Sequence, residues 1–132
     1  MKIGFIVTCY NKQSVVGACL DSIYVLRKIN PQIQLLIVVI DDNSSDASWS
    51  VLADYKKDRK IDVLFRNKFN KGISFSRNQG FRFCKETDYI TFVDADDIIT
   101  PDFLNVFEKR VWADLILCNF SYRDSESGII SQ

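Results

Sequence analysis

The feature that most constrains the fold is a regular alternation of short apolar runs with longer segments of helical periodicity. Each apolar run is nearly continuous, which is typical of a strand buried on both faces. The predicted strands are residues 3–9, 35–40, 61–65, 89–93 and 115–120. The predicted helices are residues 14–29, 47–57, 74–85 and 100–110. This order favours a parallel sheet with right-handed crossovers.

The ends of these elements carry local signals. Ser14 is placed to cap the first helix, and Asn30-Pro31 ends it. The polar run 41–46 suits a turn followed by a helix cap, and Pro101 suits the first turn of the last helix. We therefore predict an α/β fold with three α/β/α layers around an open, mostly parallel sheet. At 132 residues, the chain fits one domain over residues 1–132.

Composition excludes several classes of function. The 17 basic and 17 acidic residues cancel, which argues against a nucleic-acid partner held by a bulk basic field. The chain has no histidine, which excludes a Ser-His-Asp hydrolase, a histidine-ligated zinc site and a histidine phosphorelay. A general base would have to be a carboxylate, lysine, tyrosine, thiolate or metal-bound water.

The cysteines and the hydropathy bear on the compartment. Cys9, Cys19, Cys84 and Cys118 lie in apolar stretches without metal or redox spacing, which favours reduced, buried thiols. The longest apolar run, residues 35–40, is too short to span a bilayer, and the N-terminus lacks a signal-peptide pattern. We expect a cytoplasmic protein, with peripheral contact at the inner face of the membrane left open.

Polar and acidic residues follow three of the predicted strands: Tyr10-Asn11, Asp41-Asp42 and Asp94-Ala95-Asp96. In open parallel sheets the ligand crevice lies outside the carboxyl ends of the strands, so these segments should converge. Loop and cap roles explain residues 44–46 well. They explain Asp94, Asp96 and Asp97 poorly, because three carboxylates within four residues repel each other unless a cation lies among them.

This acidic cluster favours a hard cation such as Mg²⁺ or Mn²⁺ completed by substrate phosphates. The cation would hold a diphosphate and neutralise a leaving nucleotide. Arg77 suits phosphate by charge and geometry, although an exposed helical arginine is the commoner fate. Thr8 and Tyr10 are candidates for contact with a base and ribose, and a rim aromatic is an equal alternative for Tyr10.

Together these segments resemble the family 2 glycosyltransferases, in the order and at about the spacing of that family. They cover nearly the whole chain: residues 6–11, 39–46, 70–80, 92–97 and 100–102. The resemblance implies the Rossmann-like nucleotide-diphospho-sugar transferase fold. It also implies metal-dependent, inverting transfer from a nucleotide-diphosphate sugar, expected to be a UDP-sugar, to an acceptor hydroxyl.

The resemblance also implies roles for individual positions. Asp42 matches the position that binds the base, Arg77 the one near the phosphates, and Asp94 with Asp96 the Asp-x-Asp motif. The implied nucleotide-binding residues are Thr8, Tyr10, Asn11, Asp41, Asp42, Arg77 and Asp94, and the implied metal ligands are Asp96, which is preferred, and Asp94.

The chain departs from the family in a few places. Thr8 replaces a frequent proline, Ser76 an alanine, and Asn43 a common glycine whose left-handed backbone asparagine tolerates. Family members also continue into an acceptor-binding half that supplies the catalytic base. We therefore expect a truncated chain, with the base beyond Gln132 and an acceptor that is a saccharide or lipid-linked saccharide.

Two other functions stay open at this point. One is a non-catalytic nucleotide-binding module that needs a partner chain and whose exposed edge would favour a homo-oligomer. The other is a phosphoacceptor receiver domain, which shares the parallel sheet and acidic strand ends. That domain uses a lysine at a later strand end, whereas the last predicted strand ends Cys118-Asn119-Phe120.

Overall fold

The structure is a computed structural model that describes residues 1–108, 113–116, 121–123 and 130–131. The chain divides into two compact units, Met1–Pro101 and Asp102–Gln132. One domain over residues 1–132 stays a prediction.

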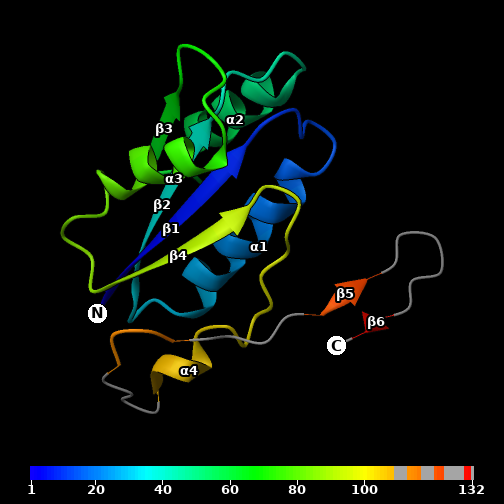
Figure 1. The fold of residues 1–132 in the computed structure, drawn as a ribbon. Helices are drawn as coiled ribbons and strands as arrows, with labels where there is room; N and C mark the ends of the chain where they lie inside the picture. The colour runs from blue at the N-terminus through cyan, green and yellow to red at the C-terminus, as the bar shows by residue number, and fades with distance from the viewer. Residues whose placement is uncertain (109–112, 117–120, 124–129, 132) are drawn as a thin grey trace. The chain divides into compact units, whose positions relative to one another are not determined.

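The first unit is built on a parallel sheet of four strands in the order β3-β2-β1-β4 (Figure 1). The strands are β1 (Lys2–Cys9), β2 (Gln34–Asp41), β3 (Val63–Arg66) and β4 (Tyr89–Asp94). The helices between them are α1 (Val16–Ile29), α2 (Ser48–Lys57) and α3 (Ile73–Phe81). The predicted alternation of strands and helices is therefore confirmed.

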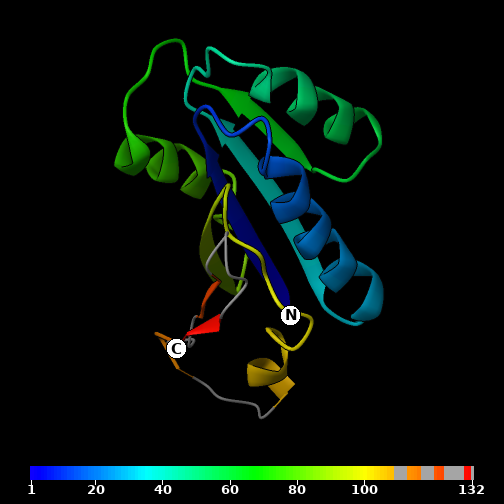
Figure 2. The ribbon, with the colours of Figure 1, turned by 90° about the vertical axis from the view of Figure 1, so that its right-hand side faces the viewer.

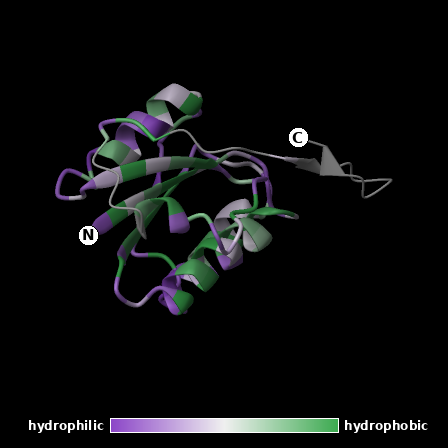
Figure 3. Cartoon of the chain, turned by 90° about the horizontal axis from the view of Figure 1, so that it is seen from below, coloured by the Kyte–Doolittle hydropathy of each residue, from purple (hydrophilic) through white to green (hydrophobic). Residues whose placement is uncertain are grey.

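Helices cover both faces of this sheet. Figure 2 shows α1 and α2 on one side and α3 on the other, which confirms the three-layer prediction. The central strands β1 and β2 are buried almost throughout, as their continuous apolar runs predict. Hydrophobic colour accordingly runs along the sheet strands, while the loops are largely hydrophilic (Figure 3).

Glycine allows α3 to pack closely on the central strand. A Cβ atom on Gly80 would lie 2.3 Å from Cγ2 of Ile6, which is fully buried in β1. On the same strand, a Cβ atom on Gly4 would lie 2.7 Å from Sγ of Cys84. Larger residues at either position would push the covering layer away from the sheet.

The register of the sheet brings the predicted polar segments together. Cys9 pairs with Asp41, and Thr8 pairs with Asp94 on the other side of β1. Asp41 in turn pairs with Arg66 at the end of β3. The carboxyl ends of all four strands therefore meet at one edge of the sheet.

Helix ends are where the predictions fail. Val15 and Val16 both donate their N–H groups to the Lys12 carbonyl, so Ser14 lies inside a turn, and the N-terminus of α1 has no side-chain cap. Helix α3 starts one residue before the predicted Ser74 and ends at Phe81 instead of Lys85. Three successive i to i−3 bonds, from the N–H groups of residues 82–84, tighten the chain there and stop the α-helix.

The second unit contains the short helix α4 (Asn105–Glu108) and an antiparallel pair, β5 (Tyr122–Arg123) and β6 (Ile130–Ser131). The predicted helix 100–110 is wrong at its start, because residues 101–104 form turns, with Asn105 N–H bonded to Asp102 O. Residues 115–116 are not in a strand, and the rest of the predicted strand 115–120 lies outside the described residues.

The prediction of reduced, buried cysteines is confirmed for the three that the structure describes. Cys9, Cys19 and Cys84 are free and buried, and Cys118 lies outside the described residues. Burial raises the pKa of the Cys9 thiol to about 11 and that of Cys19 to about 12. In the part of the chain that the structure describes, no helix is long and apolar enough to cross a membrane.

Candidate functional site

A pocket of about 500 Å³ opens at the carboxyl ends of β1, β2 and β4. Five of the predicted site residues line it: Thr8, Tyr10, Asp42, Asp94 and Asp96. Its remaining lining residues are Cys9, Lys12, Asn70, Gly72, Ile73, Ser76 and Ala95. The expected convergence of separate strand ends on one crevice is therefore confirmed.

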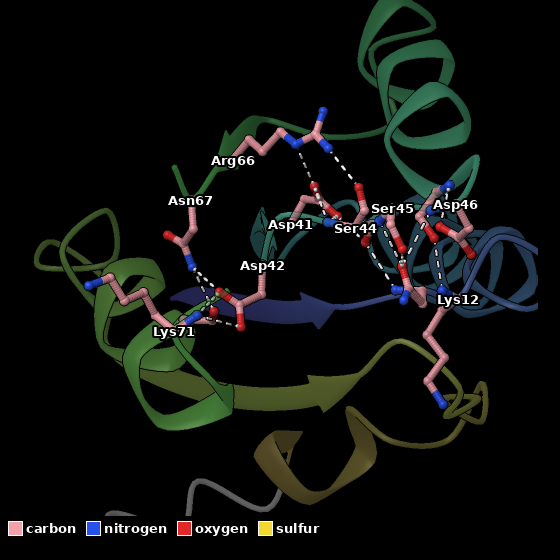
Figure 4. A network of polar contacts seen from close by, with 12 residues as sticks. Lys12, Asp41, Asp42, Ser44, Ser45, Asp46, Arg66, Asn67 and Lys71 are labelled. Carbon is pink, nitrogen blue, oxygen red and sulfur yellow. Dashed lines mark hydrogen bonds and ion pairs between the residues drawn. The ribbon is translucent and has the colours of Figure 1, made fainter. Parts of the chain in front are cut away.

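Asp42 forms one wall of the pocket, and its hydrogen bonds hold the loop that forms the adjacent wall. Its side chain accepts hydrogen bonds from Asn67 Nδ2 at 2.7 Å and from the backbone N–H groups of Lys71 and Gly72, at 3.0 and 2.7 Å (Figure 4). Gly72 has a positive φ of 84°, which glycine adopts without strain. Lys71 N–H also lies 3.2 Å from the second oxygen, so each of the two carboxylate oxygens accepts two contacts from the protein.

Asp41 has a different role from its neighbour. It is fully buried, does not line the pocket, and accepts hydrogen bonds from the backbone N–H and Oγ of Ser44. Arg66 Nε lies 3.1 Å from its carboxylate (Figure 4). The Arg66 guanidinium also lies over the Trp49 ring, 5.2 Å from its centroid. The structure thus makes Asp41 an anchor for the turn after β2 and places it behind the pocket wall.

Asn11 also acts through the backbone. Its Oδ1 accepts the N–H of Ser45 at 2.8 Å, and its own N–H donates to Ser44 Oγ at 3.0 Å. Asn43, between the acidic pair and these serines, has a φ of 62°, which confirms the expected left-handed backbone. The loops after β1 and β2 are therefore fastened together, which fixes the direction in which Tyr10 leaves β1.

Asp94 binds the predicted phosphate-site arginine. Its Oδ1 lies 3.0 Å from NH2 of Arg77 and accepts a longer, 3.4 Å hydrogen bond from Thr8 Oγ1. The Arg77 guanidinium also lies over the Phe92 ring, 5.6 Å from its centroid. Arg77 itself does not line the pocket, but these two contacts hold its charge next to a residue that does.

Asp96 is paired with a residue that the sequence argument passed over. Lys12 Nζ lies 2.6 Å from Asp96 Oδ2, and both side chains line the pocket. The Lys12 hydrogen bond and charge lower the pKa of Asp96, and the same contact raises the pKa of Lys12. Burial, with the negative charge of Asp94 and Asp96, raises the pKa of Asp97, which is the remaining sign of crowding.

These pairs change the physical explanation of the acidic cluster. From the sequence, a divalent cation was the expected reason that the carboxylates tolerate each other. In the structure, Arg77 pairs with Asp94 and Lys12 pairs with Asp96. Protein cations therefore relieve the crowding, and the acidic cluster alone does not indicate a bound metal.

The residues fit a divalent cation held jointly with a substrate. Among the described residues, no three acidic, cysteine or histidine side chains gather into a ready metal site. Mg²⁺ bound beside phosphates needs only one or two protein carboxylates, because phosphate oxygens and water complete its shell. Asp94 and Asp96 are 42% and 48% exposed at the pocket, which suits that arrangement.

Three residues of the site were not predicted from the sequence: Lys12, Arg66 and Asn67. Arg66 ends β3 and Asn67 follows it, so the rule that led to the other strand ends points to these two as well. Lys12 belongs to the same strand-end loop as Tyr10 and Asn11. Its place in that loop was the available signal, although its charge alone did not distinguish it from other lysines of the chain.

With the geometry established, comparison with known proteins identifies the family. The family model described as glycosyl transferase family 2 matches residues 5–130. The chain belongs to glycosyl transferase family 2. Membership confirms the resemblance and removes the receiver-domain alternative.

Curated glycosyltransferases match over most of this chain. Glycosyltransferase GlyA of Streptococcus pneumoniae is 35% identical in an alignment of 130 positions that covers 95% of this chain and 18% of GlyA. The poly(ribitol-phosphate) beta-glucosyltransferase of Bacillus spizizenii is 33% identical over 105 residues, 79% of this chain and 16% of that protein. The putative glycosyltransferase EpsH of Bacillus subtilis is 27% identical, and the match covers 36% of EpsH. The chain therefore spans well under half the length of these relatives.

Solved structures share the fold. S. aureus TarS 1–349 in complex with UDP-GlcNAc matches with a TM-score of 0.68 at 25% identity, over 83% of this chain and 30% of that chain. The same TarS fragment in complex with UDP also matches with a TM-score of 0.68. The mannosyltransferase PcManGT from Pyrobaculum calidifontis, in complex with GDP-Man and Mn²⁺, has a TM-score of 0.70 at 21% identity and shows likeness of fold alone.

Proposed function

We propose that this chain binds the nucleotide-diphosphate part of a sugar donor in an inverting glycosyltransferase. The donor is a UDP-sugar, and the acceptor is a hydroxyl of a saccharide or lipid-linked saccharide. The observation that carries the proposal is the convergence of Asp42, Asp94 and Asp96 on one pocket of a family 2 fold. The TarS complexes with UDP and UDP-GlcNAc support uridine as the nucleoside.

Asp42 is the proposed contact for the base. Three protein donors already fix the direction of its carboxylate, so binding does not have to order it. Asp42 lines the pocket, and a single N–H donor such as the imide N–H of uracil is proposed to take the place of its longest contact, the 3.2 Å one from Lys71 N–H. Thr8 and Tyr10, at the end of β1, are proposed to line the nucleoside next to it.

The diphosphate is proposed to lie toward Asp94 and Asp96. Arg77 is held at Asp94 and supplies positive charge on that side of the pocket. Asp96, with Asp94, would hold Mg²⁺ or Mn²⁺, which when bound neutralises charge on the leaving diphosphate. No acceptor base is assigned to the described residues, so the direct test concerns the donor.

The test is UDP binding by isothermal titration calorimetry, with and without Mn²⁺. We expect the wild type to bind UDP and Mn²⁺ to strengthen binding. Loss of a hydrogen bond to a charged group costs about 1.5–3 kcal/mol, so Asp42→Asn should bind UDP about 10- to 100-fold more weakly. Asp96→Ala should lose the Mn²⁺ effect. The control is Asp54→Asn, an exposed carboxylate on α2, which should bind like the wild type.

Two outcomes oppose the proposal. Absence of UDP binding by the wild type removes donor binding, and equal binding by Asp42→Asn removes the assigned orientation. A further measurement separates an enzyme from a non-catalytic module. Release of UDP from a UDP-sugar, with water or added saccharide as acceptor, supports an enzyme, whereas UDP binding without any release supports the module.

A further inference from the structure

Lys12 combines a fixed backbone with a movable charge at the mouth of the pocket. Its N–H donates to Ser48 Oγ at 2.8 Å, and its carbonyl accepts the N–H groups of Val15 and Val16. The side chain is 41% exposed and reaches across to Asp96, 84 positions away in sequence. The residue therefore cannot shift as a whole, but its ammonium group can change partner.

Arg77 and Lys12, the cations beside Asp94 and Asp96, differ in how freely their charged groups can move. Arg77 is held by Asp94 and by the Phe92 ring, and a guanidinium is planar and directional. Lys12 carries a compact charge on a flexible stem of four carbons. In the structure this charge occupies one oxygen of Asp96, the preferred ligand of a divalent cation. The ammonium and the metal thus compete for the same carboxylate.

We propose that Lys12 exchanges places with the metal: its ammonium holds Asp96 in the donor-free pocket and moves to the diphosphate when a divalent cation takes Asp96. The inference rests on the proposed function and adds a role for a residue outside the predicted site. A metal binding alone must displace the ammonium, whereas a diphosphate offers that ammonium a new partner. Metal and diphosphate therefore bind cooperatively, and by linkage the coupling is reciprocal.

The alternative is an ordinary ion pair at the rim of the pocket. Exposed pairs contribute little to stability, and many have no measurable effect when broken. An ordinary pair predicts that removing the Lys12 charge leaves the coupling between metal and diphosphate unchanged. The exchange proposal predicts that the same change strengthens metal binding and weakens the coupling.

The experiment measures Mn²⁺ affinity by electron paramagnetic resonance of the free ion, with and without UDP. Loss of a unit charge close to a divalent ion, partly screened by salt, should make Lys12→Met bind Mn²⁺ alone about fivefold more tightly than wild type. The factor by which UDP tightens Mn²⁺ binding should fall in the same variant. Lys28→Met, an exposed lysine at the far end of α1, is the matched control and should behave as wild type.

Asp96→Asn locates the bound ion, because it should remove the Mn²⁺ affinity that Lys12→Met gains. Unchanged or weaker Mn²⁺ affinity in Lys12→Met overturns the exchange, as does a gain that survives Asp96→Asn. Measurement without UDP keeps the two proposals separable. If the wild type fails to bind UDP, donor binding fails, while the competition between Lys12 and metal is still decided by the Mn²⁺ data alone.

Discussion

Gly80→Ala is the most direct test of how α3 is held against the sheet. The new Cβ atom would lie 2.3 Å from Ile6 Cγ2, whereas carbon atoms in contact are about 3.5–4.0 Å apart. Ile6 is fully buried on β1, which is bonded to β2 and β4 on its two sides and cannot retreat. The helix must therefore move outward by about 1 Å, or the Ile6 side chain must leave its rotamer.

Two opposing effects set the size of the change in the free energy of unfolding. Overpacking of a buried site costs about 1–3 kcal/mol, and a contact this short belongs at the upper end. Replacing a helical glycine by alanine returns about 1 kcal/mol through helix propensity. We expect a net loss of about 2 kcal/mol in the free energy of unfolding, measured by urea denaturation followed by circular dichroism.

Gly17→Ala is the matched control, because Gly17 is also helical and the nearest neighbour of its Cβ would be Tyr55, with the hydroxyl oxygen at 3.2 Å and ring carbons at 3.8 and 3.9 Å. This variant should be neutral or slightly stabilised. In an Ile6→Ala background, Gly80→Ala should cost clearly less, since the methyl group it meets is gone. Stabilisation by Gly80→Ala, or an identical cost in both backgrounds, would refute the steric explanation.

Three further predictions concern the site and its support. Asn67→Ala removes a buried donor to Asp42 and should cost about 1.5–3 kcal/mol in urea denaturation while weakening UDP binding; unchanged UDP affinity would count against the positioning of Asp42 by this bond. Arg66→Met leaves the buried Asp41 without its cation and should lower the free energy of unfolding by about 2 kcal/mol, with much of the loss recovered in the double variant with Asp41→Asn. Burial raises the pKa of Cys19 from 9.0 to about 12, so iodoacetamide at pH 8 should leave it unlabelled in the folded protein, as read by peptide mass spectrometry. Because the folded state favours the protonated Cys19 thiol, the free energy of unfolding that comes from this preference is fully present below pH 9 and declines between pH 9 and 12. Fast labelling of Cys19 in the native protein at pH 8 would contradict the raised pKa.

The strands and the pocket were predictable because a continuous apolar run predicts a buried strand. Continuous apolar runs placed β1, β2 and β4 within one or two residues, and polar residues after them marked the pocket wall. The left-handed backbone at Asn43 followed from the family resemblance, because asparagine stands in place of a common glycine and tolerates that conformation. These features depend on local sequence and on the one rule that parallel strands end at the same edge.

Partner choice was not predictable by the same means. The cation that pairs with Asp96 is set by the strand register, which brings together residues 84 positions apart. Several lysines were candidates for this pairing. The C-terminus of α3 and the start of the helix after Pro101 depend on tight i to i−3 turns, which no strong cap or breaker in the sequence predicts. Asp41 and Asp42 are adjacent and chemically alike, yet only the structure separates the anchor from the pocket wall.

The central place of β1 has a consequence for synthesis on the ribosome. One edge of β1 meets β2 soon after both leave the exit tunnel, but the other edge waits for β4, whose last residue is Asp94. At roughly 10 residues per second, the 53 residues from Asp41 to Asp94 take about 5 s to appear. During that interval β1, which is buried almost throughout in the folded sheet, presents an open edge, and an open edge of this kind can pair with strands of other chains.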